Sequence, residues 1–160
     1  MQSQGIQLPS GYEVPDIPSG CRVFRVLPYA LILPELVFGC WIWILVAATR
    51  VYLPIHNGWV MYVAASSFLF SLILLFIYVC GLHKNNCGTW RIVDAIYHGI
   101  AAMFTFSAAV TVTGTAIVCN DNIPFATCSV VYYHLLSAAS VFAYVNALLY
   151  MLHSFYSYIN

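Results

Sequence analysis

Four long apolar segments constrain the fold of this 160-residue chain more than any other feature. They cover roughly residues 27–49, 58–80, 92–118 and 129–156. Each is long enough to cross a hydrocarbon core, which takes about 20 residues as a helix. The runs are continuously apolar and lack the alternation of a membrane-barrel strand. We therefore predict an all-α integral membrane protein, a single domain built as a bundle of four transmembrane helices.

The composition excludes the main water-soluble classes. Hydrophobic residues make up 62% of the chain and charged residues 6%, and the formal net charge is zero. A typical soluble domain carries about 25% charged residues, and one this small needs them to cover its surface. Nucleic acid is excluded as a partner because the chain has no basic footprint.

The two ends of the chain differ from the apolar core. Residues 1–26 hold three prolines and three glycines among polar residues, which predicts a flexible tail. They lack the pattern of a secretory signal, so the first span is expected to act as a retained insertion signal. Residues 157–160 are expected to form a short C-terminal tail.

Basic residues near the ends of the spans predict the orientation. Arg22 and Arg25 precede the first span, and Lys84 and Arg91 lie between the second and third, all on one side. Arg50 is the only basic residue of the sequence on the opposite side. Because basic residues favour the cytosolic side, both termini are expected in the cytosol.

The cysteines fall on both predicted sides. Cys119 and Cys128 bracket the loop on the non-cytosolic side, so we predict a disulfide, with two free thiols as the alternative. Cys21, Cys80 and Cys87 lie on the cytosolic side, where thiols stay reduced. They are candidate palmitoylation sites, and simple packing or solvent exposure explains each equally well.

Ionisable and amide side chains inside the spans lie at similar depths from the cytosolic side. Asp94 and His98 are four residues apart and share a helix face. Glu35 and Asn146 are placed at comparable depth, which predicts one polar cluster of Glu35, Asp94, His98 and Asn146. One interpretation is a proton or ion relay in a small tetraspan channel or transporter. The favoured interpretation is interhelical hydrogen bonding, because transporters usually show repeats or broken helices.

The sequence shows no catalytic or cofactor-binding pattern. The five histidines are scattered without metal-ligand spacing, and no glycine-rich phosphate loop occurs. The serines lack a base and an orienting acid at a recognisable spacing. We therefore expect a protein that is not an enzyme and has no cofactor. One weak motif, which any apolar helix ending in Tyr and Lys would fit, marks a candidate sterol contact at Leu75, Tyr78 and Lys84.

Four segments together resemble the MAL proteolipid family. They are residues 33–39 (LPELVFG), 57–63 (NGWVMYV), 90–99 (WRIVDAIYHG) and 137–144 (SAASVFAY). The resemblance extends from about Val14 to the end of the chain. It implies a MARVEL domain, a four-span bundle with both termini cytosolic.

The resemblance also implies a function. Members of this family reside in raft-like membrane rich in cholesterol and sphingolipid, at the plasma membrane and on endomembrane vesicles, and organise such membrane or take part in vesicle trafficking. Membrane lipids and other raft proteins are the implied partners. Long third and fourth spans suggest sorting by bilayer thickness. Ala139, Ala143 and Ala147 recur every four residues, a spacing that suits close helix packing, and self-association through small-residue faces is also expected.

Overall fold

The computed structural model describes residues 17–50, 52–125 and 127–159, except for the side chain of Cys87. Its four long helices are α1 (Ile32–Ala48), α2 (Pro54–Cys80), α3 (Cys87–Asn122) and α4 (Val130–Ile159). Short 3-10 helices flank them: η1 (Gly20–Phe24), η2 (Tyr29–Leu31), η3 (Leu82–Asn86) and η4 (Ile123–Phe125). The described residues contain no strand, and four helices are long and apolar enough to cross a membrane. The predicted all-α fold is confirmed.

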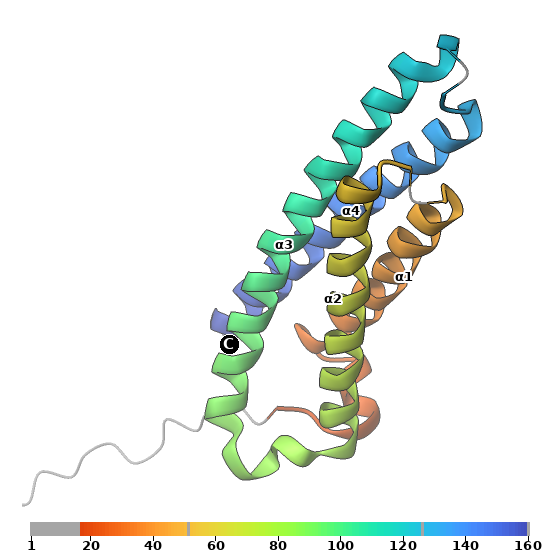
Figure 1. Ribbon diagram of the computed structural model, residues 1–160. Helices are drawn as coiled ribbons and strands as arrows, with labels where there is room; N and C mark the ends of the chain where they lie inside the picture. The colour runs from red at the N-terminus through yellow and green to blue at the C-terminus, as the bar shows by residue number, and fades with distance from the viewer. Residues whose placement is uncertain (1–16, 51, 126, 160) are drawn as a thin grey trace, which may run out of the picture.

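The helices pack as a bundle in which neighbours along the chain are neighbours in space. Helix α1 lies against α2 and α4, α2 packs against α3, and the most extensive contact joins α3 to α4 (Figure 1). At one end, α3 and α4 extend past the connection between α1 and α2. Both described chain ends lie at the opposite end.

Local sequence explains where the first two helices begin and end. Pro34 lies in the first turn of α1, where a missing backbone N–H costs no intrahelical hydrogen bond. Pro54 is the first residue of α2, so this helix starts earlier than the predicted segment 58–80. Helix α2 ends at Cys80 and is capped by Gly81, which has a φ of 71° and donates its N–H to carbonyls of the last turn. This left-handed conformation strongly favours glycine.

Parts of both predicted tails are packed against the bundle. The side chains of Ile17 and Val23 are buried in a core cluster with residues of α1 and α2, and His83 Nε2 donates to the Ile17 carbonyl at 3.0 Å. Residues 17–26 are therefore docked on the bundle because they carry apolar side chains, whereas residues 1–16 lie outside the described part. Helix α4 continues through Ile159 with Ser157 buried, so the predicted C-terminal tail is mostly the last turn of this helix.

Small residues fill the contact between α3 and α4. Ala139, Ala143 and Ala147 of α4 are buried inside the bundle, and Ala108 and Ala109 of α3 are buried with them. Small side chains allow two helices to approach closely. The alanine stripe of α4 thus packs within one chain, as its spacing predicts, and is not exposed for self-association.

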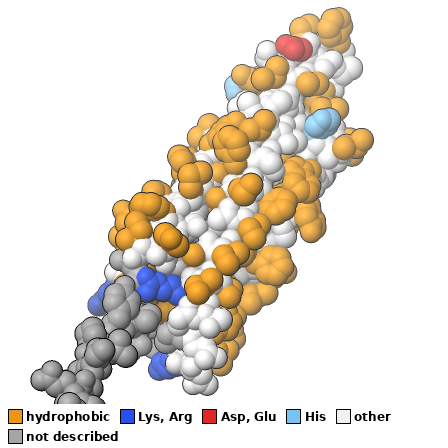
Figure 2. Space-filling view, turned by 90° about the vertical axis from the view of Figure 1, so that its left-hand side faces the viewer, with side chains coloured by type: hydrophobic (Ala, Val, Ile, Leu, Met, Phe, Trp, Pro, Cys, Tyr) orange, Lys and Arg blue, Asp and Glu red, His pale blue; other side chains and the backbone are white. Residues whose placement is uncertain are grey.

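The outside of the bundle is apolar along its length. Figure 2 shows hydrophobic side chains over most of the visible face, Lys and Arg at one end, and an acidic side chain near the other. Exposed large apolar residues come from all four helices, for example Val37, Phe76, Met103 and Leu148. Such a surface is suited to lipid rather than water.

Candidate functional site

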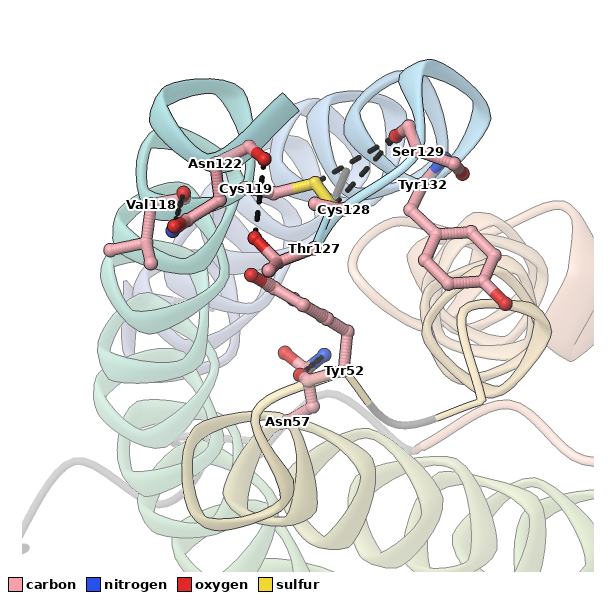
Figure 3. Close-up of a disulfide and its surroundings, with 9 residues drawn as sticks. All are labelled: Tyr52, Asn57, Val118, Cys119, Asn122, Thr127, Cys128, Ser129 and Tyr132. Carbon is pink, nitrogen blue, oxygen red and sulfur yellow. Dashed lines mark hydrogen bonds between the residues drawn. A yellow bond between two sulfur atoms is a disulfide. The ribbon is translucent and has the colours of Figure 1, made fainter. Parts of the chain in front are cut away.

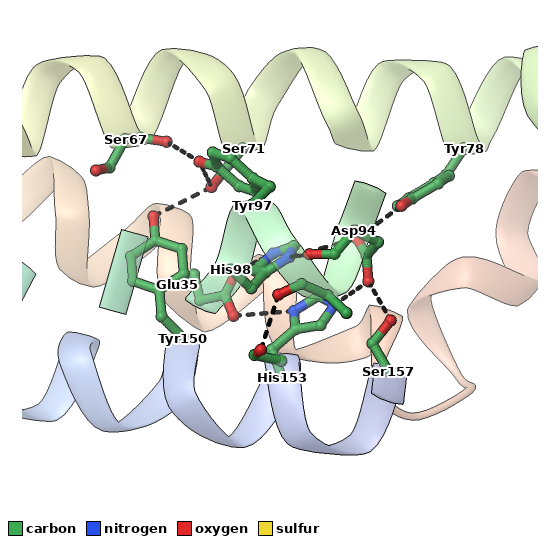
Figure 4. Close-up of polar contacts among 12 residues, drawn as sticks. Glu35, Ser67, Ser71, Tyr78, Asp94, Tyr97, His98, Tyr150, His153 and Ser157 are labelled. Carbon is green, nitrogen blue, oxygen red and sulfur yellow. Dashed lines mark hydrogen bonds and ion pairs between the residues drawn. The ribbon is translucent and has the colours of Figure 1, made fainter. Parts of the chain in front are cut away.

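Two carboxylates and two imidazoles form a closed ring inside the bundle. Glu35 comes from α1, Asp94 and His98 from α3, and His153 from α4, and all four side chains are fully buried (Figure 4). Glu35 Oε2 lies 3.3 Å from His98 Nε2, and His98 Nδ1 lies 3.3 Å from Asp94 Oδ1. Asp94 Oδ2 lies 3.3 Å from His153 Nε2, and His153 Nδ1 lies 3.0 Å from Glu35 Oε1. Each imidazole thus bridges both acids, and we call this set the carboxylate–imidazole ring.

The helices position these four groups near one end of the bundle. Glu35 lies in the first turn of α1, and Asp94 and His98 follow one another by one turn of α3. His98 Nδ1 is also 2.8 Å from the backbone carbonyl of Asp94. The rings of His98 and His153 are stacked, with centroids 3.5 Å apart and an interplanar angle of 21°. Helices α3 and α4 are therefore joined directly at this point.

Asp94 is the most connected member of the ring. The Tyr78 hydroxyl donates to its Oδ1 at 2.6 Å, and the Ser157 hydroxyl donates to its Oδ2 at 2.7 Å. Tyr78 belongs to α2, so the ring and its donors link all four helices. Tyr29 packs edge-on against Tyr78 and His153, with centroids 5.2 and 6.3 Å away.

A set of hydroxyl groups continues the polar interior beside the ring. The Ser71 hydroxyl is hydrogen-bonded to the hydroxyls of Tyr97 and Tyr150, at 3.0 and 3.1 Å. The Tyr97 hydroxyl also donates to the Ser67 carbonyl at 3.0 Å. The rings of Tyr97 and Tyr150 both lie against His98. These contacts tie α2, α3 and α4 together directly beside the ring.

The arrangement of charge favours a structural role for the ring. A neutral imidazole has one donor and one acceptor nitrogen, so it can make only one attractive contact when both nitrogens face carboxylates. An imidazolium donates from both nitrogens. Two carboxylates and two imidazolium groups sum to zero charge, which the interior of a membrane bundle tolerates far better than an unpaired ion. This matches the interpretation of the cluster as interhelical hydrogen bonding.

The sequence placed three of the four ring residues together and missed one. Glu35, Asp94 and His98 meet as expected. Asn146 is buried on α4, but among the described residues no hydrogen bond or ion pair joins it to the ring. His153 lies two turns further on and takes the place expected for Asn146. The sequence pattern that could have indicated His153 is a run of polar residues on one face of α4. They are spaced by four, three and four positions: Asn146, Tyr150, His153 and Ser157.

The other predicted sites have different outcomes. Tyr78 is fully buried and bonded to Asp94, so a sterol on the outside cannot reach it and the predicted contact at Leu75, Tyr78 and Lys84 fails at its central residue. Cys21 and Cys80 are exposed free thiols, as a modification site requires. The side chain of Cys87 lies outside the described residues.

A disulfide joins the far end of α3 to the loop that precedes α4. Cys119 and Cys128 are bonded, as the sequence predicted, with Cα atoms 5.4 Å apart (Figure 3). The Thr127 hydroxyl donates to the Asn122 carbonyl at 3.2 Å within the closed loop. The side chain of Tyr52, from the connection between α1 and α2, packs against the core cluster that contains both cysteines. The bridge therefore fixes the end of the bundle opposite the ring.

Replacing both bridging cysteines with serine (Cys119→Ser with Cys128→Ser) is expected to lower the free energy of unfolding by about 2–3 kcal/mol, from the closure of a short loop. Unfolding of the purified chain in mild detergent, followed by tryptophan fluorescence with and without reductant, measures this. Reductant should shift the wild-type transition and leave that of the double variant unchanged. The matched control is Cys80→Ser, which removes an exposed free thiol. A wild-type transition insensitive to reductant would contradict the bridge.

Comparison with known proteins agrees with the fold. A family model described as a membrane-associating domain, MARVEL, matches residues 24–156. The chain is 39% identical to myelin and lymphocyte protein of Bos taurus over 91% of this chain and 92% of that protein. It is 38% identical to the Homo sapiens protein of the same name, over 89% of this chain and 90% of that protein. Plasmolipin of Danio rerio is 31% identical over 84% of this chain and 72% of its own. No solved structure matches the chain.

Proposed function

The chain belongs to the MARVEL family of membrane-associating domains, and we propose that this tetraspan membrane protein is a non-enzymatic organiser of membrane rich in cholesterol and sphingolipid, with a role in vesicle trafficking. Its partners in this proposal are those lipids, further copies of the chain and other raft membrane proteins. The site of action is the plasma membrane and endomembrane vesicles.

The observation that carries the proposal is the length of α3 and α4. With 36 and 30 residues, they are about 54 and 45 Å long, and their apolar segments 92–118 and 129–156 cover about 40 Å of each, whereas the hydrocarbon core of an average bilayer is about 30 Å thick. Apolar residues such as Ile117 and Val131 remain exposed near their far ends. Thicker, sterol-rich membrane covers more of this surface, and each ångström of mismatch costs a fraction of a kcal/mol. The free energy of such a bundle is therefore lower in the thicker membrane.

The distribution of charge and sulfur supports cytosolic termini. Lys and Arg gather at the end that also holds the carboxylate–imidazole ring, while the disulfide lies at the other end. Basic flanks favour the cytosol, and disulfides persist in oxidising compartments. Acylation of the exposed Cys21 and Cys80 at the basic end would add affinity for ordered lipid.

A small channel or transporter has less support as an alternative. All four ionisable groups of the interior ring are fully buried, and each contacts two partners of the ring within the bundle. Groups satisfied in this way join helices. The ring thus supports a rigid bundle whose outer surface carries the function.

Partition between ordered and disordered phases of giant vesicles tests the proposal. Purified wild-type chain is expected to prefer the ordered phase. Replacing Ile117 and Val131 with glutamine shortens the apolar surface of α3 and α4, and is expected to cost about 1 kcal/mol, or about fivefold in the partition coefficient.

Leucine at the same two positions is the matched control, since it keeps the apolar length. The leucine pair should partition as the wild type does. Equal partition of the wild type between the phases would contradict thickness sorting. A glutamine pair that still prefers the ordered phase as strongly would show that the length of α3 and α4 plays no part in it.

A further inference from the structure

We propose that the groove between α3 and α4 binds one membrane phospholipid, whose phosphate is held by Arg91 and whose acyl chain lies between the two helices. The groove has a volume of about 570 Å³ and is lined almost entirely by apolar atoms of both helices. This volume falls within the range of about 300–1,000 Å³ that small-molecule sites occupy. We call it the outer groove, because it opens away from the carboxylate–imidazole ring toward the lipid.

Small side chains of α3 line the outer groove along its length. Ala95, Gly99 and Ala102 follow one another by four and three positions, so they share one face of the helix. The Ser154 hydroxyl of α4 also lines the groove, but it donates to the Ala95 carbonyl at 2.8 Å and is therefore satisfied within the bundle. Such a lining suits a hydrocarbon chain better than a ligand with polar groups along its length.

The remaining side chains of the outer groove are long or aromatic and exposed. Met103 of α3 and Met151 and Phe155 of α4 are among them. Unbranched thioether side chains adapt to ligands of different shape. They can therefore close around an acyl chain without a fixed ring geometry in the ligand.

The outer groove has the depth of one leaflet of the bilayer. From Ala95 to Phe106, both of which line it, the rise of α3 is about 16 Å. Half of a hydrocarbon core about 30 Å thick is about 15 Å. A chain that enters beside Ala95 therefore ends near the centre of the bilayer, as an acyl chain of that leaflet does.

Arg91 lies at the mouth of the outer groove. It precedes Ala95 by one turn on the same face of α3, and its Nε donates to the Ser157 carbonyl of α4 at 3.2 Å. Its side chain is half-buried, and among the residues that the structure describes no carboxylate forms an ion pair with it. Tyr158, the next residue of α4, lines the same end with a phenol that can donate to an oxygen anion. A guanidinium is well suited to bind phosphate.

The charge of Arg91 favours a phospholipid over the other candidate occupants. A sterol has no anionic group and would leave the guanidinium unpaired. A second copy of the chain enters the membrane in the same orientation, and its described carboxylates cannot reach Arg91: Glu35 and Asp94 are buried, and Asp121 lies in the last turn of α3 at the opposite end. A phospholipid supplies both the anion and the chain. This site does not depend on the proposed preference for thick membrane.

Native mass spectrometry of the full chain in mild detergent tests the proposal, with dioleoyl phosphatidylserine as the probe. We expect the first phosphatidylserine to bind more tightly than all further ones, with a stoichiometry of one per chain. Equimolar cholesterol should not displace it. No ordered lipid phase is present in this measurement, so its failure would leave the partition experiment in vesicles unaffected.

Variants separate the outer groove from general attraction to a basic surface. Arg91→Gln is expected to weaken the first binding step about tenfold, the scale of losing a hydrogen bond to a charged group, whereas Arg91→Lys keeps the charge and should lose less. Ala95→Leu keeps Arg91 but narrows the groove beside it, and should also weaken this step. Arg22→Gln is the matched control, since Arg22 is exposed and belongs to η1, which packs against α2. It should leave the first binding step unchanged.

Four results would overturn the proposal. The wild type would bind no phosphatidylserine in preference to further copies of the lipid, or cholesterol would displace it. Arg22→Gln would weaken the first step as much as Arg91→Gln does. Alternatively, Ala95→Leu would leave lipid binding unchanged and abolish a dimer of the chain, which would identify a second copy as the occupant of the groove.

Discussion

Replacing Asp94 with alanine is expected to lower the free energy of unfolding by about 3–5 kcal/mol, the scale of breaking a buried ion pair from one side. The change leaves His98 and His153 with a single carboxylate between them and removes the acceptor of the Tyr78 and Ser157 hydroxyls. Denaturant unfolding in detergent, followed by tryptophan fluorescence, measures the loss.

Asp121→Ala is the matched control, because Asp121 lies on the same helix and is exposed. It is expected to change the stability by no more than about 0.5 kcal/mol. Asp94→Asn keeps the volume and one acceptor oxygen, and its loss should lie between the two. An Asp94→Ala chain as stable as Asp121→Ala would show that the ring does not hold the helices together.

Glu35→Ala and His153→Ala are each expected to cost about 3–5 kcal/mol, and the double variant should cost less than their sum by about 0.5–3 kcal/mol. Either change alone leaves a charge without its counterpart. Together they remove a facing pair, joined at 3.0 Å, and leave Asp94 and His98 as a neutral pair.

The control is a second double-mutant cycle, which combines Glu35→Ala with His134→Ala. His134 is exposed and lies five turns from His153 along α4, so the two changes should add within about 0.3–0.5 kcal/mol. Additivity of Glu35→Ala and His153→Ala would contradict the direct contact between α1 and α4 at the ring.

The number and type of the helices could be predicted because each rests on local information. A continuous apolar run of more than twenty residues has few alternatives to a transmembrane helix. The pairing of Asp94 with His98 follows from helical periodicity alone. A count of residues from Arg25 placed Glu35 level with Asp94 and His98, although α1 itself begins only at Ile32. These features required no knowledge of how one helix is turned toward another.

The rest of the site depends on the rotation and register of packed helices. Glu35 and His153 are 118 positions apart, and nothing local indicates that they meet. The histidines look scattered along the chain, yet His98 and His153 stack, and their spacing in the sequence does not indicate this contact. The docking of residues 17–26 was missed for a similar reason: their prolines and glycines resemble a tail, while burial of Ile17 and Val23 depends on the surface that α1 and α2 provide.

Quantitative analysis of the lipids that surround the chain tests the central claim most directly. Polymer extraction of native membrane patches, without detergent, preserves those lipids. Patches that contain the wild-type chain are expected to be enriched in cholesterol and sphingolipid over the bulk membrane, and patches with the Ile117→Gln and Val131→Gln pair should be less enriched. Wild-type patches with the composition of the bulk membrane would contradict the account.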